Sequence, residues 1–460
     1  MSEAGPIDAK QAREPSWWVE PIAERSRAWI ERHREPLERS SDVLLGLGVL
    51  MAWTQSDVTS ALVGLLWLVL RLAISPGSQT FNWALILILL LNLRGVVLHE
   101  GPKPFSHIEY IVVITAFVAG LGRPLRHWQA SLVAIAVAAV IGFVFNLTPL
   151  SVSLQAIWAG QADLPGYLAQ SWGGQYFRVG SLSVNQTAFL CGLSLCQSAA
   201  VAIRSSGSLR ILMTLAATSS AIAAFATGSR LAMLLPPLLV AAALLLTRQS
   251  PSTPARADGH PPRRDWWRPR RLALVIGAAA LALVLLHQSG LDSRLLHTFF
   301  ERKSSGDDGR LTVLACYLGL PFLEPGFWFF GAGYGAAMVR FCDEDVGITV
   351  SHAHNFIVQI VADSGLISAA AVTLAAVLVF GRLKRLLSAS SGTGVDGPRA
   401  HLIGPALLAS CLFLLIFNIF ELTTLKVTML TLLFGFLPAC SFWVRSPSQR
   451  TSAPSLPALH

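Results

Sequence analysis

Two histidines and an asparagine stand where a long polar segment gives way to an apolar one, in Ser351-His352-Ala353-His354-Asn355-Phe356. An imidazole can accept a proton near neutral pH, so His354 is a candidate general base. Asn355 would orient that ring or a substrate hydroxyl, and His352 is the rival base. For either histidine alone, a capping or interface role is the alternative. Two histidines at i and i+2 diverge on a helix and no third ligand is evident, so we predict no metal site.

Three arginines form a second set of candidates, because a guanidinium stays charged and binds phosphate oxygens with two parallel hydrogen bonds. We predict that Arg230, Arg310 and Arg178 bind an anion. The alternatives are a snorkelling side chain at a helix end for Arg230, a surface ion pair with Asp307 or Asp308 for Arg310, and interface anchoring beside aromatic residues for Arg178. Their local sequences are Tyr176-Phe177-Arg178-Val179-Gly180, Thr227-Gly228-Ser229-Arg230 and Gly306-Asp307-Asp308-Gly309-Arg310.

A glycine-rich stretch, Gly331-Ala332-Gly333-Tyr334-Gly335, precedes the histidines. A dinucleotide-binding motif needs a preceding strand, a different glycine spacing and an acidic residue further along the chain, and this stretch lacks all three. It therefore predicts a turn at which two backbones approach closely. Cys316 and Cys342 flank it, and they would be able to pair if they face an oxidising compartment. The six cysteines show no CxxC spacing, which gives no sign of a zinc or redox motif.

The composition indicates the elements that must position these residues. Of 460 residues, 53% are hydrophobic and 13% charged, against about 25% charged in soluble domains. This excludes disorder, a collagen-like fibre and a small disulfide scaffold, and it disfavours a soluble enzyme. A polytopic membrane protein remains. Its net charge of +9 is then typical of basic cytoplasmic loops, so we expect no nucleic-acid partner. The polar start shows no cleavable signal peptide.

We predict an all-α membrane bundle of about 12 transmembrane helices with one large helical periplasmic loop, because a span needs roughly 20 apolar residues. The first two stretches are short and could instead form one long tilted helix, which would give eleven spans. The predicted spans are 43–56, 59–74, 81–98, 107–122, 128–147, 181–203, 209–228, 230–247, 272–290, 351–380, 401–420 and 425–444.

The distribution of basic residues orients the bundle, because cytoplasmic loops are rich in Lys and Arg. Segment 248–271 has seven arginines against two acids, whereas segment 291–350 has five basic and eight acidic residues. The first is therefore cytoplasmic and the second external. The predicted organisation is a cytoplasmic arm (1–42), helices 1–5 (43–147), a periplasmic loop (148–180), helices 6–8 (181–247), a basic linker (248–271), helix 9 (272–290), the large periplasmic loop (291–350), helices 10–12 (351–444) and a cytoplasmic tail (445–460).

Two further expectations concern the arm and the spans. Trp18, Ile22, Trp29 and Ile30 would share one face of a helix on the cytoplasmic membrane surface, although a solvated arm fits the arm's sequence as well.

The predicted spans hold almost no acids in their interiors. A proton- or sodium-coupled transporter usually needs carboxylates there, so a twelve-span transporter is the weaker alternative.

The motifs together resemble the O-antigen ligase and polymerase superfamily of bacterial inner-membrane proteins. The resemblance rests on their order and common face, over residues 175–380. The residues that carry it are Arg178-x-Gly180 with Asn185, Gly228-Ser229-Arg230, Gly309-Arg310, Gly331-x-Gly333-x-Gly335, His352-x-His354-Asn355, Gln359 and Asp363-Ser364-Gly365-Leu366-Ile367.

The resemblance implies a metal-independent glycosyltransferase with no cofactor, whose active site faces the periplasm among membrane lipids. The donor would be an undecaprenyl diphosphate-linked glycan and the acceptor a hydroxyl of the lipid A core or of another glycan. Arginines would stabilise the diphosphate and His354 would take the acceptor's proton. Many polymerases of this group have glycine eleven positions after a loop arginine, and no external arginine here does. This favours a ligase over an O-antigen or exopolysaccharide polymerase.

Overall fold

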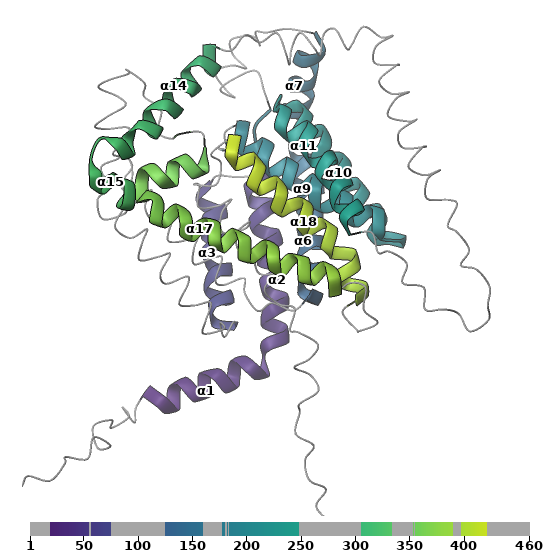
Figure 1. The fold of residues 1–460 in the computed structure, drawn as a ribbon. Helices are drawn as coiled ribbons and strands as arrows, with labels where there is room; N and C mark the ends of the chain where they lie inside the picture. Colours follow the sequence, from purple (N-terminus) through teal and green to yellow (C-terminus); the bar gives the residue numbers. More distant parts are fainter. Residues whose placement is uncertain are drawn as a thin grey trace, which may run out of the picture.

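The computed structural model describes residues 19–54, 57–74, 125–159, 177–179, 182, 184–247, 305–333, 353, 355–389 and 397–420. Within these ranges every element is a helix and no strand occurs (Figure 1). The all-α prediction is therefore confirmed for the described part of the chain. The predicted spans 81–98, 107–122, 272–290 and 425–444 lie outside it.

Among the described residues, four helices are long and apolar enough to cross a membrane, by length and composition. They are Trp128–Phe145 within α6 (Leu125–Phe145), α9 (Val184–Arg204), α10 (Gly207–Ala226) and His401–Ile419 within α18 (Gly397–Phe420). Each coincides with a predicted span to within a few residues. The chain is thus a helical membrane protein, and the number of twelve spans stays a prediction.

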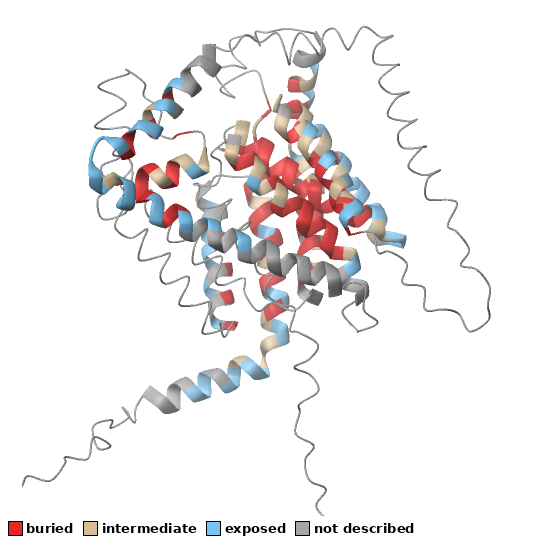
Figure 2. Ribbon diagram, in the orientation of Figure 1, coloured by how far each residue is buried: buried red, intermediate tan, exposed pale blue. Residues whose placement is uncertain are grey.

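Helix α9 forms the centre of the bundle. It packs against α10, α18 and α11 (Arg230–Leu246), and Figure 2 shows its surface as largely buried. Phe189 of α9 stacks on Phe413 of α18 with ring centroids 5.6 Å apart. Gly192, one turn further, leaves the space that Phe413 occupies, since a Cβ there would lie 2.3 Å from that ring. Small residues that admit large partners are typical of membrane helix packing.

Arg204 fixes the relative directions of these helices. Its guanidinium donates to the carbonyl oxygen of His401 at 2.6 Å and to Oγ1 of Thr247 at 2.5 Å. The ends of α9 and α11 therefore meet the beginning of α18. Consequently α9 and α11 run parallel and α18 runs antiparallel to both, as the alternating topology requires. The opposite end of the bundle holds the beginnings of α9 and α11.

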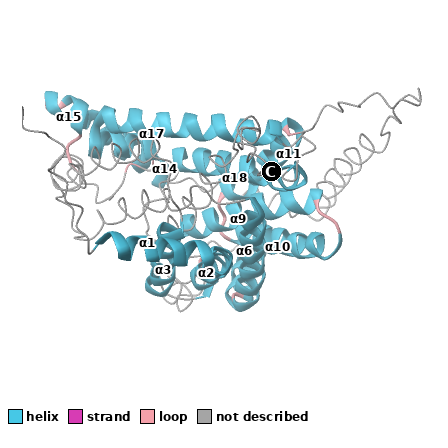
Figure 3. Ribbon diagram, turned by 90° about the horizontal axis from the view of Figure 1, so that it is seen from below, coloured by secondary structure: helices cyan, strands magenta, loops and turns pink. Residues whose placement is uncertain are grey.

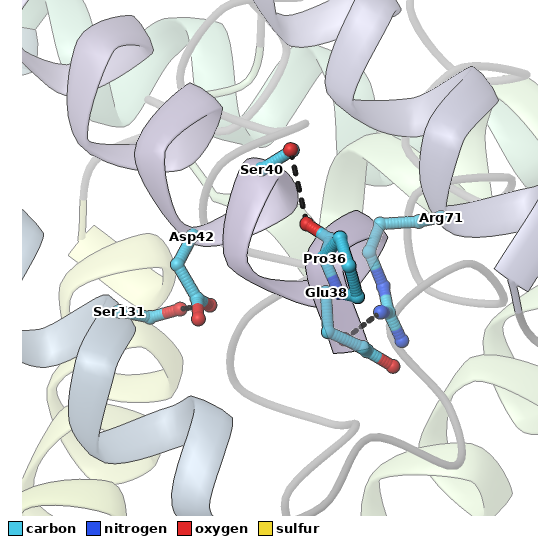
Figure 4. Close-up of polar contacts among 6 residues, drawn as sticks. All are labelled: Pro36, Glu38, Ser40, Asp42, Arg71 and Ser131. Atoms are coloured by element: carbon cyan, nitrogen blue, oxygen red, sulfur yellow. Dashed lines mark hydrogen bonds and ion pairs between the residues drawn. The ribbon is translucent and has the colours of Figure 1, made fainter. Parts of the chain in front are cut away.

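The first two predicted spans are separate helices, so the single tilted helix is wrong. Helices α2 (Arg34–Thr54) and α3 (Asp57–Ile74) pack side by side. A buried ion pair between Arg71, near the end of α3, and Glu38, near the beginning of α2, shows that they are antiparallel (Figure 4). The chain therefore reverses direction between Thr54 and Asp57.

Helix α6 lies parallel to α2 and is bonded to it near both ends. Ser131 donates to the Asp42 carboxylate at 2.8 Å (Figure 4). At the other end Asn146 donates to the carbonyl oxygen of Trp53 at 2.7 Å. Between these bonds a Cβ on Gly142 would lie 2.4 Å from Trp53, so the two helices approach closely.

The four described helices that could cross a membrane hold no acidic residue, as expected, but buried acids occur in other helices. Glu38 and Asp42 are buried in α2, and Asp363 is buried in α17 (Phe356–Ala389). The first two were assigned to the arm because we expected the span to begin at residue 43. In the structure the helix begins nine residues earlier, at Arg34, and each acid has a polar partner that offsets its desolvation.

The remaining described helices are peripheral. Helix α1 (Val19–Arg32) precedes α2 and points away from the bundle in Figure 1. Its helical form fits the predicted amphipathic arm. Helix α7 (Leu147–Ala159) lies in the first predicted external loop. The large external loop contains α14 (Ser305–Gly319), a short 3-10 helix η2 (Leu320–Phe322) and α15 (Pro325–Phe330), as predicted for a folded helical loop.

The buried ion pair yields a stability prediction. Replacing Arg71 by Met should lower the free energy of unfolding by about 3–5 kcal/mol, because Glu38 would stay buried without its cation. Replacing both residues, Arg71→Met with Glu38→Met, should restore most of the loss. The measurement is the thermal unfolding midpoint of the purified protein in detergent.

The exposed pair between Arg39 and Glu35, with an N–O distance of 3.0 Å, supplies the matched control. Arg39→Met should change the stability by less than about 1 kcal/mol, because solvent screens an exposed pair. Equal midpoints for Arg71→Met and Arg39→Met would contradict the structural role of the buried pair.

Candidate functional site

Asn355 begins α17 by capping it. Its side-chain oxygen accepts hydrogen bonds from the backbone N–H groups of Ile357 at 3.0 Å and Val358 at 3.1 Å. Its backbone oxygen accepts from Gln359 at 2.9 Å. This is the N-cap arrangement that Asn favours. The cap role of Asn355 was not predicted, and an additional role toward an imidazole or a substrate would fall to its amide nitrogen.

Gln359 attaches the segment of the two histidines to α17. Its side-chain oxygen accepts from the backbone N–H of Ala353 at 2.7 Å, and its amide donates to the Asp363 carboxylate at 2.7 Å. All three residues are buried. Ala353 stands between His352 and His354, which lie outside the described residues. The backbone N–H of Ala353 is therefore held at a fixed point near the beginning of α17.

Helix α17 is interrupted at Gly365, whose φ is +80°. At this interruption the carbonyl oxygens of Ala362 and Asp363 accept from the N–H groups of Ala332 at 2.8 Å and Gly333 at 3.1 Å. The glycine-rich turn thus satisfies backbone groups of a broken helix, which is essential where no water can do so.

Only glycine allows this contact between the turn and α17. Gly331 and Gly333 have φ values of +74° and +102°. A Cβ on Gly331 would lie 2.3 Å from the backbone of Asp363, and one on Gly365 would lie 2.2 Å from the carbonyl oxygen of Phe329. The prediction of a turn that lets backbones approach closely is confirmed for residues 331–333, whereas Gly335 lies outside the described part.

Arg178 lies next to the turn between α10 and α11. The N–H of Phe177 donates to the carbonyl oxygen of Ala226 at 3.0 Å, and the N–H of Val179 donates to Oγ1 of Thr187 in α9 at 3.0 Å. Phe177 and Val179 are buried and Arg178 is half-buried. Among the residues that the structure describes, no hydrogen bond or ion pair of the Arg178 guanidinium occurs. Since Phe177 packs in the core, it is not an aromatic anchor at the membrane interface.

Hydrogen bonds of its own side chains stabilise the turn at residues 227–229. Thr227 donates its hydroxyl to the carbonyl oxygen of Ala224 at 2.6 Å and accepts from the N–H of Ser229 at 3.3 Å. Gly228 has a φ of +67°. Ser229 caps α11 by accepting from the N–H of Ala232 at 3.4 Å. The predicted tight turn is confirmed, and Arg230 is the first residue of α11, with its side chain outside the described part.

Arg310 lies elsewhere than expected. We placed the Gly306–Arg310 motif just before an apolar helix, but α14 begins at Ser305 and includes it. The apolar pattern begins only at Leu311, which misled the prediction, whereas serine and acidic residues favour the first turn of a helix. The side chain of Arg310 lies outside the described part, and so does its predicted ion pair with Asp307 or Asp308.

Cys316, two turns further along α14, is disulfide-bonded. Cys342, the predicted partner, lies outside the described residues.

The structure thus brings the candidates together in two groups. Arg178, the beginning of α11 at Arg230, and Asn185 in the first turn of α9 share the end of the bundle opposite Arg204. The second group contains Ala353, Asn355, Gln359 and the Gly331–Gly333 turn. In the sequence analysis Gln359 and Asp363 belonged only to the resemblance, and their interaction was not predicted. Their i, i+4 spacing in an apolar stretch is a signal that could have indicated a pair on one helix face.

Comparison with known proteins adds no assignment, since no family model matches the chain and no curated protein matches its sequence. Within the described ranges no three His, Cys, Asp or Glu side chains are grouped for a metal ion. The two histidines lie outside those ranges, so the prediction of no metal site there stays a prediction.

The close contact at Gly365 is testable. Gly365→Ala should destabilise the protein by at least about 1–3 kcal/mol, because the new Cβ meets the Phe329 carbonyl in a backbone conformation that L-residues avoid. Gly326→Ala is the matched control, since a Cβ there meets nothing within 4 Å. Limited proteolysis between α14 and α17 and thermal unfolding would report both variants. Equal resistance of the two would contradict the tight contact.

Proposed function

We propose that the chain is an O-antigen ligase-type glycosyltransferase of the bacterial inner membrane, which transfers a glycan from undecaprenyl diphosphate to a hydroxyl of the lipid A core at the periplasmic face. The observation that carries the proposal is the bond between Phe177 and Ala226. It joins two separate motifs, so Arg178 and the first residue of α11, Arg230, stand at one end of the bundle.

The glycan transfer needs groups that stabilise negative charge on the leaving diphosphate and a base that takes the proton of the acceptor hydroxyl. The acceptor oxygen attacks the anomeric carbon, the bond from that carbon to the diphosphate breaks, and undecaprenyl diphosphate leaves with the electron pair. Guanidinium groups stabilise the charge that develops on the leaving diphosphate. Arg178 suits this role because its guanidinium is half-buried and has no ionic partner in the described part of the chain. Arg230 and Arg310 would complete the diphosphate site.

The proton of the acceptor hydroxyl passes to His354 in this proposal. The supporting observation is the anchoring of Ala353 by Gln359 at 2.7 Å, which holds the neighbouring backbone in place. Preorganisation of a base in this way lowers the entropy cost of reaching the reactive geometry. The amide nitrogen of Asn355 would orient the acceptor, since its oxygen already caps α17.

Two observations support a periplasmic location for this end. The disulfide at Cys316 fits an oxidising compartment and so supports an external position of α14. Arg204 and Arg210 lie at the opposite end, where α11 also ends, and the sequence that follows α11 is basic, as the distribution of Lys and Arg predicts for the cytoplasmic side.

The role of Arg178 leads to a test with purified protein and a carrier-linked glycan. Arg178→Lys should keep the fold but lower the transfer rate on the order of 10²–10³-fold, because a point charge cannot replace a bidentate donor pair. Arg210→Lys, an exposed arginine at the opposite end, should transfer at the wild-type rate. Normal transfer by Arg178→Lys and also by Arg178→Ala would remove Arg178 from the diphosphate site.

The assignment of the base is tested by comparing His354→Ala with His352→Ala at matched expression. His354→Ala should lose roughly 10²–10⁴-fold in rate while still binding the carrier lipid, because the arginines remain. His352→Ala should retain more activity. Full activity of His354→Ala would refute the base, and loss of wild-type activity in EDTA would favour a metal held by the two histidines.

A deletion strain separates the proposed ligase from its alternatives. Loss of a ligase should leave the lipid A core without long chains, while carrier-linked polymer accumulates. A core capped with a single repeat would instead identify a polymerase. Unchanged lipopolysaccharide on the gel would argue against both and in favour of the transporter, for which the buried acids of α2 and α17 would then be the first residues to test.

A further inference from the structure

The segment Leu318–Phe330 exposes an unusual number of large apolar side chains, although it belongs to the predicted external loop. Phe322 is 71% exposed and Phe329 is 56% exposed. We call this segment the aromatic hairpin; it comprises the end of α14, η2 and α15. Its other exposed apolar residues are Leu318, Leu323, Trp328 and Phe330.

The opposite side of the aromatic hairpin is packed against α17. Tyr317 and Leu320 form a small buried cluster with Val313, Ala353 and Ala362. Gly331 and Gly365 hold the two backbones in direct contact. The hairpin therefore has one fixed inner side, and its apolar outer side is not a result of loose packing. Figure 2 shows α15 as almost entirely exposed, and Figure 3 places it at the edge of the molecule, away from α2, α3 and α6.

The outer side continues a surface of α17 that is also apolar. Ile357, Leu366 and Ile367 of α17 are exposed beside the hairpin. Over residues 311–335 the only charged side chain is Glu324. A surface of this extent in contact with water would favour aggregation, whereas Phe and Trp side chains beside a membrane helix are typical of a lipid-facing surface near the interface.

The backbone of the aromatic hairpin meets the condition for contact with lipid. Leu323 donates to Leu320 at 3.1 Å, Phe327 donates to Glu324 at 3.0 Å, and Gly331 donates to Phe327 at 2.9 Å. The next two N–H groups, of Ala332 and Gly333, bond to α17. Non-helical backbone at membrane depth is tolerated where protein groups satisfy it in this way.

We propose that the aromatic hairpin is immersed in the outer leaflet of the membrane, where phospholipid acyl chains cover Phe322, Phe329 and the exposed residues of α17. The large loop is then only partly in water, and α17 enters the bilayer with the hairpin attached to it. This inference depends on the membrane location of α17 and not on the proposed transferase activity.

The test uses the full-length wild-type protein in liposomes of phosphatidylethanolamine and phosphatidylglycerol that contain a phospholipid with a diazirine in its acyl chain. After illumination, adducts are located by mass spectrometry. We expect adducts on residues 318–330 at a yield comparable to that on the exposed face of α3, where Leu66 is 57% exposed. Residues 207–210, in the predicted cytoplasmic turn, should carry almost none.

A matched pair of variants completes the test. Phe329→Asp should remove most adducts from the hairpin while those on α3 stay unchanged, because a carboxylate resists burial in lipid. Phe329→Leu should keep them. Wild-type hairpin yields as low as those of residues 207–210, with normal labelling of α3, would overturn the proposal. Equal labelling of the Asp and Leu variants would also overturn it. No glycan substrate is present, so either failure leaves the transferase proposal unaffected.

Discussion

The constraint on which the described structure depends is that every backbone polar group must find a partner where water is scarce. The break at Gly365 shows how the chain meets it, because the N–H groups of Ala332 and Gly333 bond to carbonyl oxygens of α17. That contact requires glycine on both sides and brings the external loop onto the helix. The aromatic hairpin takes its position from this contact, and a separate bond to Gln359 holds the backbone at Ala353.

Charged and polar side chains follow a related rule. Arg71 and Glu38 neutralise each other, Ser131 bonds to Asp42, and Gln359 bonds to Asp363. The first two pairs join α2 to α3 and to α6, and the third joins two successive turns of α17. A buried pair contributes little net stability when compared with apolar packing, but it specifies which helices pair and in which direction. In this protein the pairs of α2 determine that α3 runs antiparallel to it and α6 runs parallel.

The proposed transferase needs arginines without ionic partners at the end of the bundle that would bind the diphosphate. At the other end the basic residues can be hydrogen-bonded or solvated. Arg178 and Arg204 illustrate the two conditions. Arg204 is bonded to Thr247 and His401 and joins three helices, whereas within the described residues the backbone bonds of Phe177 and Val179 hold the chain at Arg178, whose guanidinium has no partner there. Attachment through the backbone leaves the guanidinium available to an anion. At Ala353, too, the backbone N–H is the anchored group, and it is held by the side chain of Gln359.

The sequence by itself determined the class of the protein, the approximate position of each described span, and the turns at Gly228 and Gly331, because hydropathy and glycine act locally along the chain. It did not determine that α2 begins at Arg34, since polar residues there are tolerated only through partners on α3 and α6. It also did not reveal that Asn355 caps α17, that Gln359 holds Ala353, or that the chain adjoining Arg178 meets the end of α10. These relationships connect residues through space, so only the tertiary structure, in which buried polar groups must be matched, decided them.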